Sequence, residues 1–360
     1  MTAQANVSQA AQQPTDLSMV ETIFGFVPVK DVEDWDLLRH YFQPILDYYT
    51  DPEITEVLIN RFDHIEVERG GRLHHLPDAR FASEADLQEL IFQVANRLNQ
   101  LIDDENPTMD ARFPDGSRLC CTLPAVSPKG STVTLRCKPR DAYTFADLVR
   151  FGALTGEMVE YIKQRVESAD TMLVTGNTGS GKTTLLRACG HFIDPRERVI
   201  TAEDTAELHM GEMLPGVVSL EAPKRRLKDG QKPIELASLI KLMLRMRPDR
   251  GWVGEVRDAA AADAVVQLSN TGHTGGATSM HANGPDDAIR RFQYLLASAG
   301  LVSYELAGHQ VLNSFQLLIH AHRSYQFGRK VTHICRIENE KIVPIFLFNE
   351  QTGKHERVGE

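Results

Sequence analysis

One segment of this sequence combines glycines, a lysine and threonines in a spacing that binds phosphate. Residues 176–183 read Gly-Asn-Thr-Gly-Ser-Gly-Lys-Thr, a complete Gly-x-x-x-x-Gly-Lys-Thr phosphate loop. In such a loop the glycines let backbone N–H groups face a phosphate, the lysine meets the β and γ phosphates, and the threonine hydroxyl can hold Mg²⁺. We therefore expect a nucleotide site formed by Gly176, Asn177, Thr178, Gly179, Ser180, Gly181, Lys182, Thr183 and Thr184.

The residues on either side of the loop agree with this interpretation. The apolar run 171–175 predicts a strand that enters the loop, and residues 184–189 continue as a helix. A strand followed by a glycine-rich loop and a helix places the loop N–H groups at a helix N-terminus.

Glu255 is the first candidate for a catalytic carboxylate. It ends the short apolar segment 251–255, which predicts a strand. In phosphate-loop ATPases an acidic residue at such a strand end holds the water shell of the metal or orients the attacking water. Gly254 stands where many such enzymes carry Asp, so water activation is favoured over metal chelation.

Glu203 and Asp204 follow a second predicted strand, 198–202. Open α/β sheets bind ligands at the carboxyl ends of their strands, so these carboxylates could position water and Mg²⁺. Thr183, Glu203 and Glu255 are therefore the candidate metal-side residues. For Asp204 the alternative is that its carboxylate caps a helix.

His273 and His281 lie on either side of the glycine-containing segment 274–280. A neutral histidine at a strand end can sense the γ-phosphate through a hydrogen bond, although a structural role is the common alternative for a single histidine. On spacing alone the structural role is favoured.

Composition limits the class of protein. The 360 residues suffice for two domains, with 42% hydrophobic and 24% charged residues. The net charge of −10 disfavours a protein whose main role is binding DNA or RNA phosphates. The five cysteines show no metal-ligand spacing, which predicts reduced thiols and no zinc site. With no apolar run of membrane-spanning length, a cytoplasmic protein, at most peripheral to a membrane, is expected.

The chain order predicts an α/β protein with two domains. Residues 1–20 read as a flexible leader, and 21–138 as a smaller α+β domain with a helix over 35–49, a hairpin turning at Gly70-Gly71 and a helix opened by Ser83. Helices then alternate with buried strands, which predicts a mainly parallel sheet. We place a linker at 139–147, the ATPase domain at 148–345 and a C-terminal tail at 346–360. The basic stretch 224–228 reads as an exposed loop.

Four segments in this order resemble the boxes of the secretion ATPase superfamily, the motors of type IV secretion and conjugation, type II secretion and pilus assembly. These are GNTGSGKTT, TAEDTAEL at 201–208, LRMRPDRGWVGEVRD at 244–258 and TGHTGGATSMHAN at 271–283. The spacing, together with DPEITEVLIN at 51–60 and DARFPDGSRL at 110–119, is similar to the type IV secretion and conjugation branch. Ala202 and Asp258 depart from the usual pattern of the family.

The resemblance implies a RecA-like ATPase domain and assigns roles to residues. Glu203 would be the acidic-box glutamate and Glu255 the Walker B glutamate. His273 and His281 would belong to the histidine box, so we expect His281 to be catalytic and His273 to contact the nucleotide. The family also brings arginines of the N-terminal domain to the γ-phosphate, and Arg118 and Arg136 match those positions. A forked guanidinium suits the charge of a phosphoryl group in transfer.

The resulting expectation is a hexameric Mg²⁺-dependent ATPase at the cytoplasmic face of the inner membrane, with membrane components of the machine and a coupling ATPase as partners. A pilus-assembly or type II secretion motor is the alternative within the family. A nucleic-acid motor would need stacking aromatics in a basic groove, which this acidic chain with 7% aromatic residues does not suggest. A module that binds ATP without turning it over is disfavoured by Glu203 and Glu255.

Overall fold

The computed structural model describes residues 19–137, 143–223 and 233–360, which form two compact units. The first unit comprises the described residues up to 137, and the second comprises those from 143 onward. Each is described here by itself. Among the helices that the structure describes, none combines the length and the apolar character that a membrane span requires.

The first unit is built on an antiparallel sheet of six strands in the order β5-β4-β3-β8-β7-β6. Its strands are β3 (Ile54–Arg61), β4 (His64–Arg69), β5 (Arg72–His75), β6 (Thr108–Arg112), β7 (Arg118–Thr122) and β8 (Thr132–Arg136). A separate hairpin and three α-helices precede or interrupt these strands: β1 (Met19–Thr22), β2 (Gly25–Pro28), the 3₁₀ turn η1 (Val29–Asp31), α1 (Val32–Tyr41), α2 (Leu46–Thr50) and α3 (Glu84–Arg97).

The core of this unit lies on one face of the sheet. Alternate residues of β7 and β8, such as Leu119 and Leu135, are buried with the apolar side of α3. Ser83 begins α3 as predicted, because its hydroxyl accepts a hydrogen bond from the Asp86 N–H at 3.2 Å. Phe24, fully buried, packs against a cluster of rings from α1, the segment after it, and the β6–β7 turn.

The helix predicted over 35–49 is two helices in the structure. α1 ends at Tyr41 and α2 begins at Leu46. Pro44 lies between them, and a proline lacks the N–H that an interior helical position requires and disfavours helical geometry at the residue before it.

The second unit contains a mixed sheet of nine strands in the order β11-β10-β12-β13-β9-β14-β15-β16-β17. The strands from β11 to β14 in this order are parallel, and β15 to β17 extend the sheet in antiparallel fashion. Their bounds are β9 (Met172–Gly176), β10 (Val199–Glu203), β11 (Val218–Glu221), β12 (Arg250–Glu255), β13 (Ala277–His281), β14 (Leu317–Ser324), β15 (Gly328–Glu338), β16 (Lys341–Asn349) and β17 (Lys354–Arg357).

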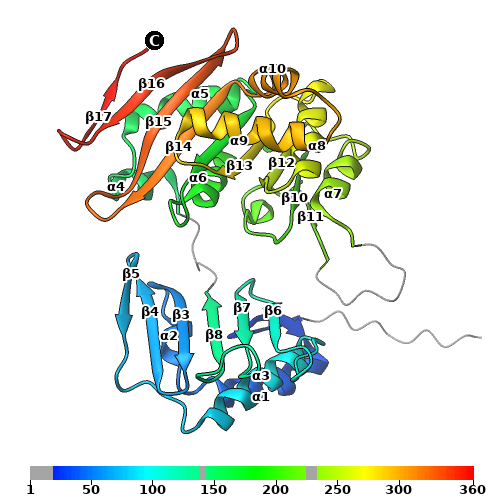
Figure 1. The fold of residues 1–360 in the computed structure, drawn as a ribbon, viewed down its shortest axis with the longest axis vertical. Coiled ribbons are helices and arrows are strands. Elements are labelled where there is room, and N and C mark those ends of the chain that lie inside the picture. Colours follow the sequence, from blue (N-terminus) through cyan, green and yellow to red (C-terminus); the bar gives the residue numbers. More distant parts are fainter. Residues whose placement is uncertain (1–18, 138–142, 224–232) are drawn as a thin grey trace, which may run out of the picture. The chain divides into compact units, whose positions relative to one another are not determined.

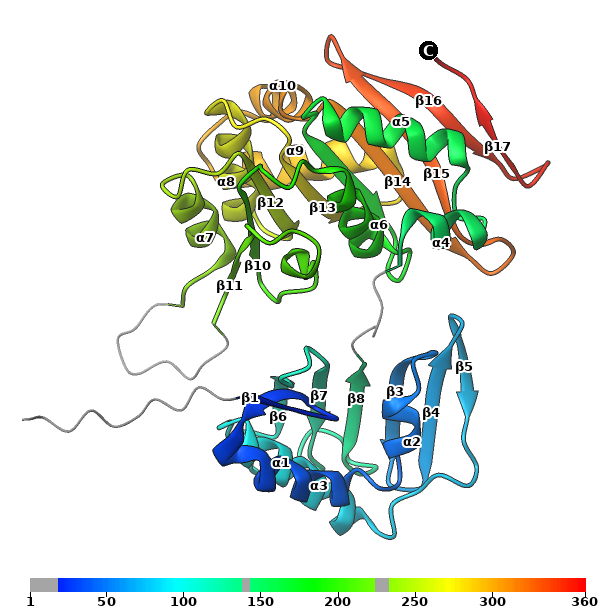
Figure 2. The ribbon, with the colours of Figure 1, turned by 180° about the vertical axis from the view of Figure 1, so that it is seen from behind.

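Helices cover both faces of this sheet, so its central strands are buried on both sides (Figures 1 and 2). One face carries α7 (Leu236–Met243), α8 (Ala259–Asn270), α9 (Pro285–Ser298) and α10 (Tyr304–Ser314), and the other carries α5 (Gly156–Glu167) and α6 (Lys182–Cys189). α4 (Phe145–Arg150) and the 3₁₀ turns η2 (Gly190–Phe192) and η3 (Met210–Glu212) complete the unit. Within β9, Leu173 is buried against the face that carries α7 to α10, whereas its neighbours Met172 and Val174 are buried against the face that carries α5 and α6.

Three predicted boundaries need correction. Residues 346–360, predicted as a tail, contain the end of β16 and all of β17, because Phe346 pairs with Arg357 and is buried in the core. Thr144 caps α4 inside the predicted linker 139–147, of which residues 139–142 lie outside the described chain. Met19 and Val20 belong to β1, and the remaining leader, 1–18, lies outside the described residues, as does the basic stretch 224–228.

Candidate nucleotide-binding site

The phosphate loop lies between β9 and α6, as the sequence predicts. β9 ends at Gly176, and α6 begins at Lys182 after Gly181, which has a left-handed φ of 94°. A positive φ at this position favours glycine, and it turns the chain directly into the first turn of the helix. The loop therefore presents its backbone to a helix N-terminus, the arrangement that binds phosphate.

Gly176 also has a steric reason to be glycine. A Cβ atom there would lie 2.0 Å from the carbonyl oxygen of Ala321 on the neighbouring strand β14. The close approach of β14 therefore fixes the start of the loop.

Lys182 and His281 meet at the carboxyl ends of β9 and β13. The Lys182 ammonium lies 3.2 Å from His281 Nδ1, and it also donates to the carbonyl oxygens of Gly176 at 3.3 Å and Asn177 at 3.2 Å. His281 Nε2 in turn lies 3.1 Å from Glu255 Oε1. Lysine is only a donor, so Nδ1 is the accepting nitrogen and the neutral ring carries its proton on Nε2. Burial lowers the pKa of His281, although Glu255 opposes this shift.

Glu255 is held in place by the junction between β12 and β13. The register of these strands shifts between Trp252 and Glu255. There Ser279 donates to the carbonyl oxygen of Gly254 at 2.7 Å, and the Val256 N–H donates to Ser279 at 2.9 Å. Arg257 adds an ion pair to Glu255 at 2.8 Å. The predicted catalytic carboxylate thus lies beside the phosphate-loop lysine, with His281 between them.

Glu203 lies at the end of β10 and is only 3% exposed. Its Oε1 accepts hydrogen bonds from the backbone N–H groups of Glu207 at 3.0 Å and Leu208 at 3.1 Å. Burial raises the pKa of Glu203 to about 7 in spite of these donors. Glu203 also explains Gly254, because a Cβ atom there would lie 3.0 Å from Glu203 Cγ and an Asp would collide with it.

Glu207 is a site residue that sequence reasoning missed. The Thr183 hydroxyl donates to Glu207 Oε2 at 3.4 Å. Glu203, which the sequence assigns to the metal side together with Thr183, accepts hydrogen bonds from the backbone that carries Glu207, and its metal-side role stays a prediction. The sequence signal that could have indicated Glu207 is the segment 201–208, in which Glu207 follows Glu203 by four residues.

His273 does not lie at the phosphate loop. β13 runs parallel to β9, with Ala277 opposite Met172 and His281 opposite Gly176, so the residues before Ala277 lie at the amino edge of the sheet. There the His273 ring contacts the Thr271 hydroxyl at 3.0 Å. The length of β13, at about 3.3 Å per residue, separates the two edges. The predicted contact of His273 with the nucleotide of its own subunit is therefore corrected.

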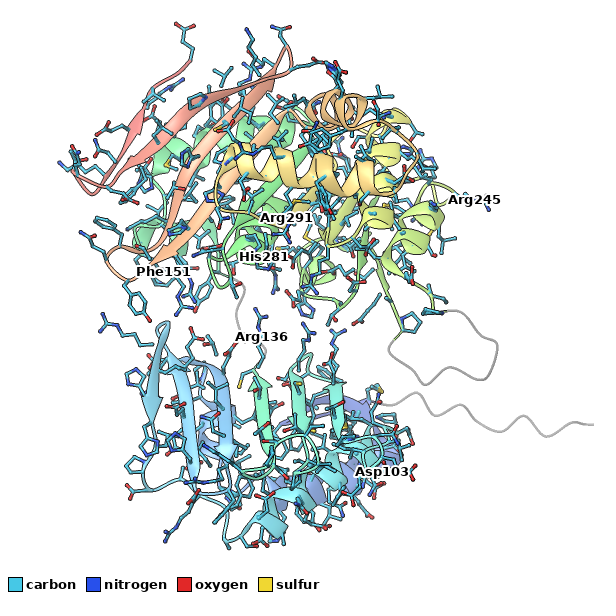
Figure 3. All side chains as sticks on the ribbon, viewed as in Figure 1. Asp103, Arg136, Phe151, Arg245, His281 and Arg291 are labelled. Atoms are coloured by element: carbon cyan, nitrogen blue, oxygen red, sulfur yellow. The ribbon has the colours of Figure 1, made fainter. Side chains whose placement is uncertain are left out.

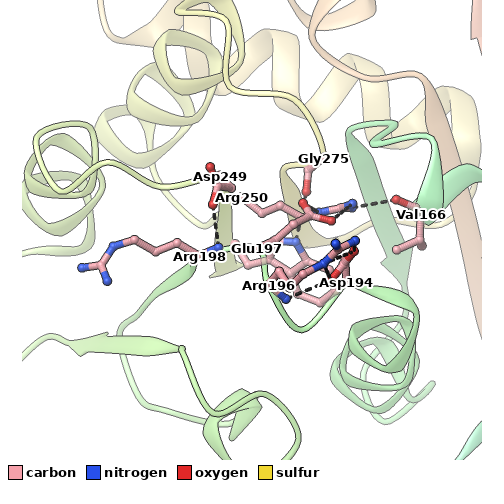
Figure 4. A network of polar contacts seen from close by, with 9 residues as sticks. Val166, Asp194, Arg196, Glu197, Arg198, Asp249, Arg250 and Gly275 are labelled. Atoms are coloured by element: carbon pink, nitrogen blue, oxygen red, sulfur yellow. Dashed lines mark hydrogen bonds and ion pairs between the residues drawn. The ribbon is translucent and has the colours of Figure 1, made fainter.

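A polar network occupies this amino edge (Figure 4). Arg250, 2% exposed, donates to both carboxylate oxygens of Glu197 at 2.6 and 2.8 Å and to the carbonyl oxygen of Val166 at 2.7 Å. The Trp252 indole donates to the carbonyl oxygen of Gly275 at 3.1 Å. These contacts tie the loops before β10 and β13 to the end of α5.

Arg118 and Arg136 lie in the first unit, directly opposite each other on β7 and β8. Directly paired residues of antiparallel strands point to the same face of the sheet. Arg112 of β6 is the partner of Arg118 on its other side, so the three arginines form one row. Figure 3 labels Arg136 at the end of β8 and His281 at the end of β13, each within its own unit. Approach of the arginines to a nucleotide stays a prediction.

The structure shows which of two further acidic residues caps a helix. Asp258, one of the departures from the family pattern, caps α8, because its carboxylate accepts from the Ala261 N–H at 2.8 Å. Asp204 does not cap a helix: the described residues after it form bends and coil until η3 begins at Met210.

The fold and site together define a mixed α/β protein with a phosphate loop whose lysine lies next to a histidine and a carboxylate. Its particular family follows from comparison with known proteins. A family model described as "Type II/IV secretion system protein" matches residues 40–343, and the chain belongs to this family. This confirms the resemblance to the secretion ATPase superfamily, in its type IV secretion and conjugation branch.

Two relatives illustrate the relationship. The conjugal transfer protein TrbB of Rhizobium radiobacter is 32% identical over 292 residues, covering 80% of this chain and 85% of that protein. The type IV secretion system protein VirB11 of Brucella suis is 26% identical over 343 residues, covering 88% of this chain and 94% of that protein.

Solved structures share the fold. The ATPase DotB of Legionella pneumophila matches with a TM-score of 0.61 at 21% identity, covering 84% of this chain and 82% of DotB. The pilus retraction motor PilT with bound ADP matches with a TM-score of 0.55 at 21% identity, covering 81% of this chain and 80% of PilT.

Proposed function

We propose that this protein is an Mg²⁺-dependent ATPase that powers the assembly of, or substrate transfer through, a type IV secretion or conjugation machine. The observation that carries the proposal is the contact chain from Lys182 through His281 to Glu255. It joins the phosphate-binding cation to the carboxylate suited to orient an attacking water. The family and the relatives support the machine that this chemistry serves.

Lys182 would exchange its present partners for the β and γ phosphates of ATP. In the structure it donates to two carbonyl oxygens of its own loop and to His281. A bound polyphosphate offers charged acceptors instead, which make stronger hydrogen bonds with an ammonium than neutral groups do. His281 would then keep its proton directed at Glu255 and orient that carboxylate toward the water.

The residues beside the loop also fit Mg²⁺. The Thr183 hydroxyl and the Glu207 carboxylate lie next to each other and supply hard oxygen atoms, the ligands that Mg²⁺ prefers together with waters and substrate phosphates. When bound, Mg²⁺ neutralises charge on the phosphates. Thr183 would hold the ion directly, and Glu207 would accept hydrogen bonds from its waters. Glu203 and Glu255 would contribute from the same edge of the sheet.

The finer features of the family enter as part of the same proposal. The second unit would be a RecA-like ATPase domain, and Arg118 and Arg136 of the first unit would complete the site at the γ-phosphate. The subunits would form a hexamer at the cytoplasmic face of the inner membrane, with membrane components of the machine and a coupling ATPase as partners. The likeness in fold to PilT keeps a pilus motor as the second candidate.

The test compares phosphate release from ATP by the wild type, Lys182→Ala and Lys241→Ala. Loss of the Lys182 ammonium should lower kcat/KM by about 10²-fold or more, because the transferring phosphoryl loses a positive partner. Lys241 is an exposed lysine on α7, so its variant should behave as wild type. Normal turnover by a folded Lys182→Ala protein would contradict the assignment of the site.

A further inference from the structure

The hairpin formed by β14 and β15 contacts the phosphate loop from the side. β14 pairs with β9 in parallel up to Ala321 opposite Gly176, the first residue of the loop. Beyond that point Arg323 pairs with Arg329 across the hairpin. The end of the hairpin therefore lies where the loop leaves the sheet.

Asn177 extends the pairing of the strands with its side chain. Its carboxamide oxygen accepts from the Arg323 N–H at 2.9 Å, and its carboxamide nitrogen donates to the Arg323 carbonyl oxygen at 2.9 Å. The carboxamide has the same donor and acceptor as a peptide group, so it replaces the next backbone pair of the ladder. The first variable position of the loop is thus fixed to β14.

Arg329 holds the middle of the loop. Its Nε donates to the carbonyl oxygen of Gly179 at 2.8 Å. Arg323 approaches the same residue, because a Cβ atom on Gly179 would lie 2.8 Å from Arg323 Nη1. Two points of the loop, Asn177 and Gly179, are therefore attached to one hairpin.

These contacts leave the phosphate-binding groups of the loop available. They use the Asn177 side chain and the Gly179 carbonyl, whereas phosphate is bound by backbone N–H groups and by Lys182. The hydrogen bonds from Lys182 to the loop carbonyls, in contrast, occupy a phosphate-binding group and must break when the lysine binds a phosphate. The hairpin contacts can persist before and after nucleotide binds.

We infer that Asn177 and Arg329 are positioning residues that hold the phosphate loop in its anion-binding shape before the nucleotide arrives. A loop that samples other shapes binds with an affinity reduced by the fraction of time it is competent. Holding one shape removes that loss and the ordering cost of binding. This inference rests on the proposed nucleotide site and adds the element that prepares it.

The experiment measures ADP affinity and amide hydrogen exchange on the full chain. Asn177→Ala should weaken ADP binding by about 5- to 20-fold, since two hydrogen bonds to Arg323 are lost. KM for ATP should rise by a similar factor, with a smaller change in kcat. Without nucleotide, amides of the loop should exchange faster than in the wild type, and saturating ADP should reduce the difference. Gln326→Ala, an exposed residue in the turn of the same hairpin, should change none of these values.

A pair of Arg329 variants separates the hydrogen bond from the charge. Arg329→Ala removes both, and Arg329→Lys keeps the positive charge but lacks the planar Nε donor. Weaker ADP binding and faster loop exchange in both variants are expected. Full recovery by lysine would mean that Arg329 acts by charge alone, which would overturn its part of the inference.

The remaining outcomes distinguish the inference from the function it rests on. If wild-type protein binds ADP and Asn177→Ala binds it equally well with unchanged loop exchange, the positioning role is wrong and the nucleotide site stands. If wild-type protein fails to bind ADP, the proposed function itself is wrong.

Discussion

His281 Nε2 lies 3.1 Å from Glu255 Oε1, while its other ring nitrogen lies 3.2 Å from the Lys182 ammonium. One imidazole therefore lies between the cation proposed to bind the phosphate and the carboxylate proposed to orient the water. Only the neutral ring can do both, because a protonated Nδ1 could not accept from lysine and would repel it.

Replacement of Glu255 by Gln tests the carboxylate. The amide keeps the shape of the side chain but loses the charge that orients or activates water, so kcat should fall by about 10²-fold or more. ATP binding should be retained. Steady-state turnover and nucleotide titration of the same preparation give both values, and equal losses in the two would indicate a metal-binding role instead.

The histidine predicts a pH dependence of turnover. Burial lowers the pKa of His281, so the ring is neutral at pH 7 and gains its proton only below its ordinary range. We expect kcat to fall on the acid side, with a midpoint below 6.5. His281→Asn should reduce kcat by about 10-fold or more and remove that acid limb. An acid limb of unchanged midpoint in the variant would assign the titration to another group.

Glu207 predicts a change in magnesium requirement. Glu207→Gln should raise the Mg²⁺ concentration for half-maximal turnover by about 10-fold. This factor is the lower end of the range seen when a residue that supports a metal ligand is lost. Glu33→Gln, the same charge change at an exposed residue of α1 in the first unit, serves as a control for general effects of altered net charge. A Mg²⁺ curve identical to wild type would remove Glu207 from the metal side.

Glu203 predicts how stability depends on pH. Its pKa is about 7 in the folded protein and near the ordinary value of 4.5 in the unfolded chain. Between these values the folded state binds more protons, so ionisation of Glu203 lowers the free energy of unfolding as the pH rises from about 4.5 to about 7. Glu203→Gln removes this group while its amide oxygen can still accept the two N–H bonds. Its melting temperature should match wild type near pH 5 and exceed it at pH 8, and a constant difference across this range would contradict the assignment.

The paired arginines predict an effect on turnover with little effect on ADP. Arg118→Ala or Arg136→Ala should lower kcat by about 10- to 10³-fold, because charge spread over the transferring phosphoryl loses a partner. ADP, which lacks the γ-phosphate, should bind nearly as before. Arg72→Ala on β5 of the same sheet offers an exposed arginine as the control. Unchanged turnover in both variants would contradict the proposed role of the two arginines at the γ-phosphate. The roles proposed for Lys182 and Glu255 would still stand.

Sequence reasoning succeeded where local pattern decides structure. The phosphate loop, its strand and its helix need only the spacing of glycines around Lys182 and an apolar run before them. The helix predicted to open at Ser83 is α3, because the Ser83 hydroxyl accepts a hydrogen bond from the first turn of that helix. The order of the four family boxes also located Glu255 and His281 correctly at one edge of the sheet.

Pattern failed where position depends on pairing between distant strands. His273 and His281 look equivalent in the sequence, yet the direction of β13 puts them at opposite edges. Which of Glu203 and Glu207 contacts Thr183 depends on the path of the chain after β10, and the sequence alone does not give that path. The predicted tail 346–360 wrongly included Phe346, whose burial depends on antiparallel strands that extend the phosphate-loop sheet.

Arg250, which is 2% exposed, and its partner Glu197 form a buried ion pair at the amino edge of the sheet, whereas Lys182 and Glu255 lie at the carboxyl edge. Removing one member of such a pair leaves an uncompensated charge in the interior. Saturation mutagenesis would therefore give two groups of harmful variants, which differ in the amount of protein that remains. Changes around Arg250 and Glu197 would deplete the cell of protein through misfolding and proteolysis. Changes around Lys182 and Glu255 would instead leave protein levels normal while stopping the motor. Protein abundance would therefore fall for variants of the amino edge, and transfer efficiency at normal abundance would fall for variants of the carboxyl edge.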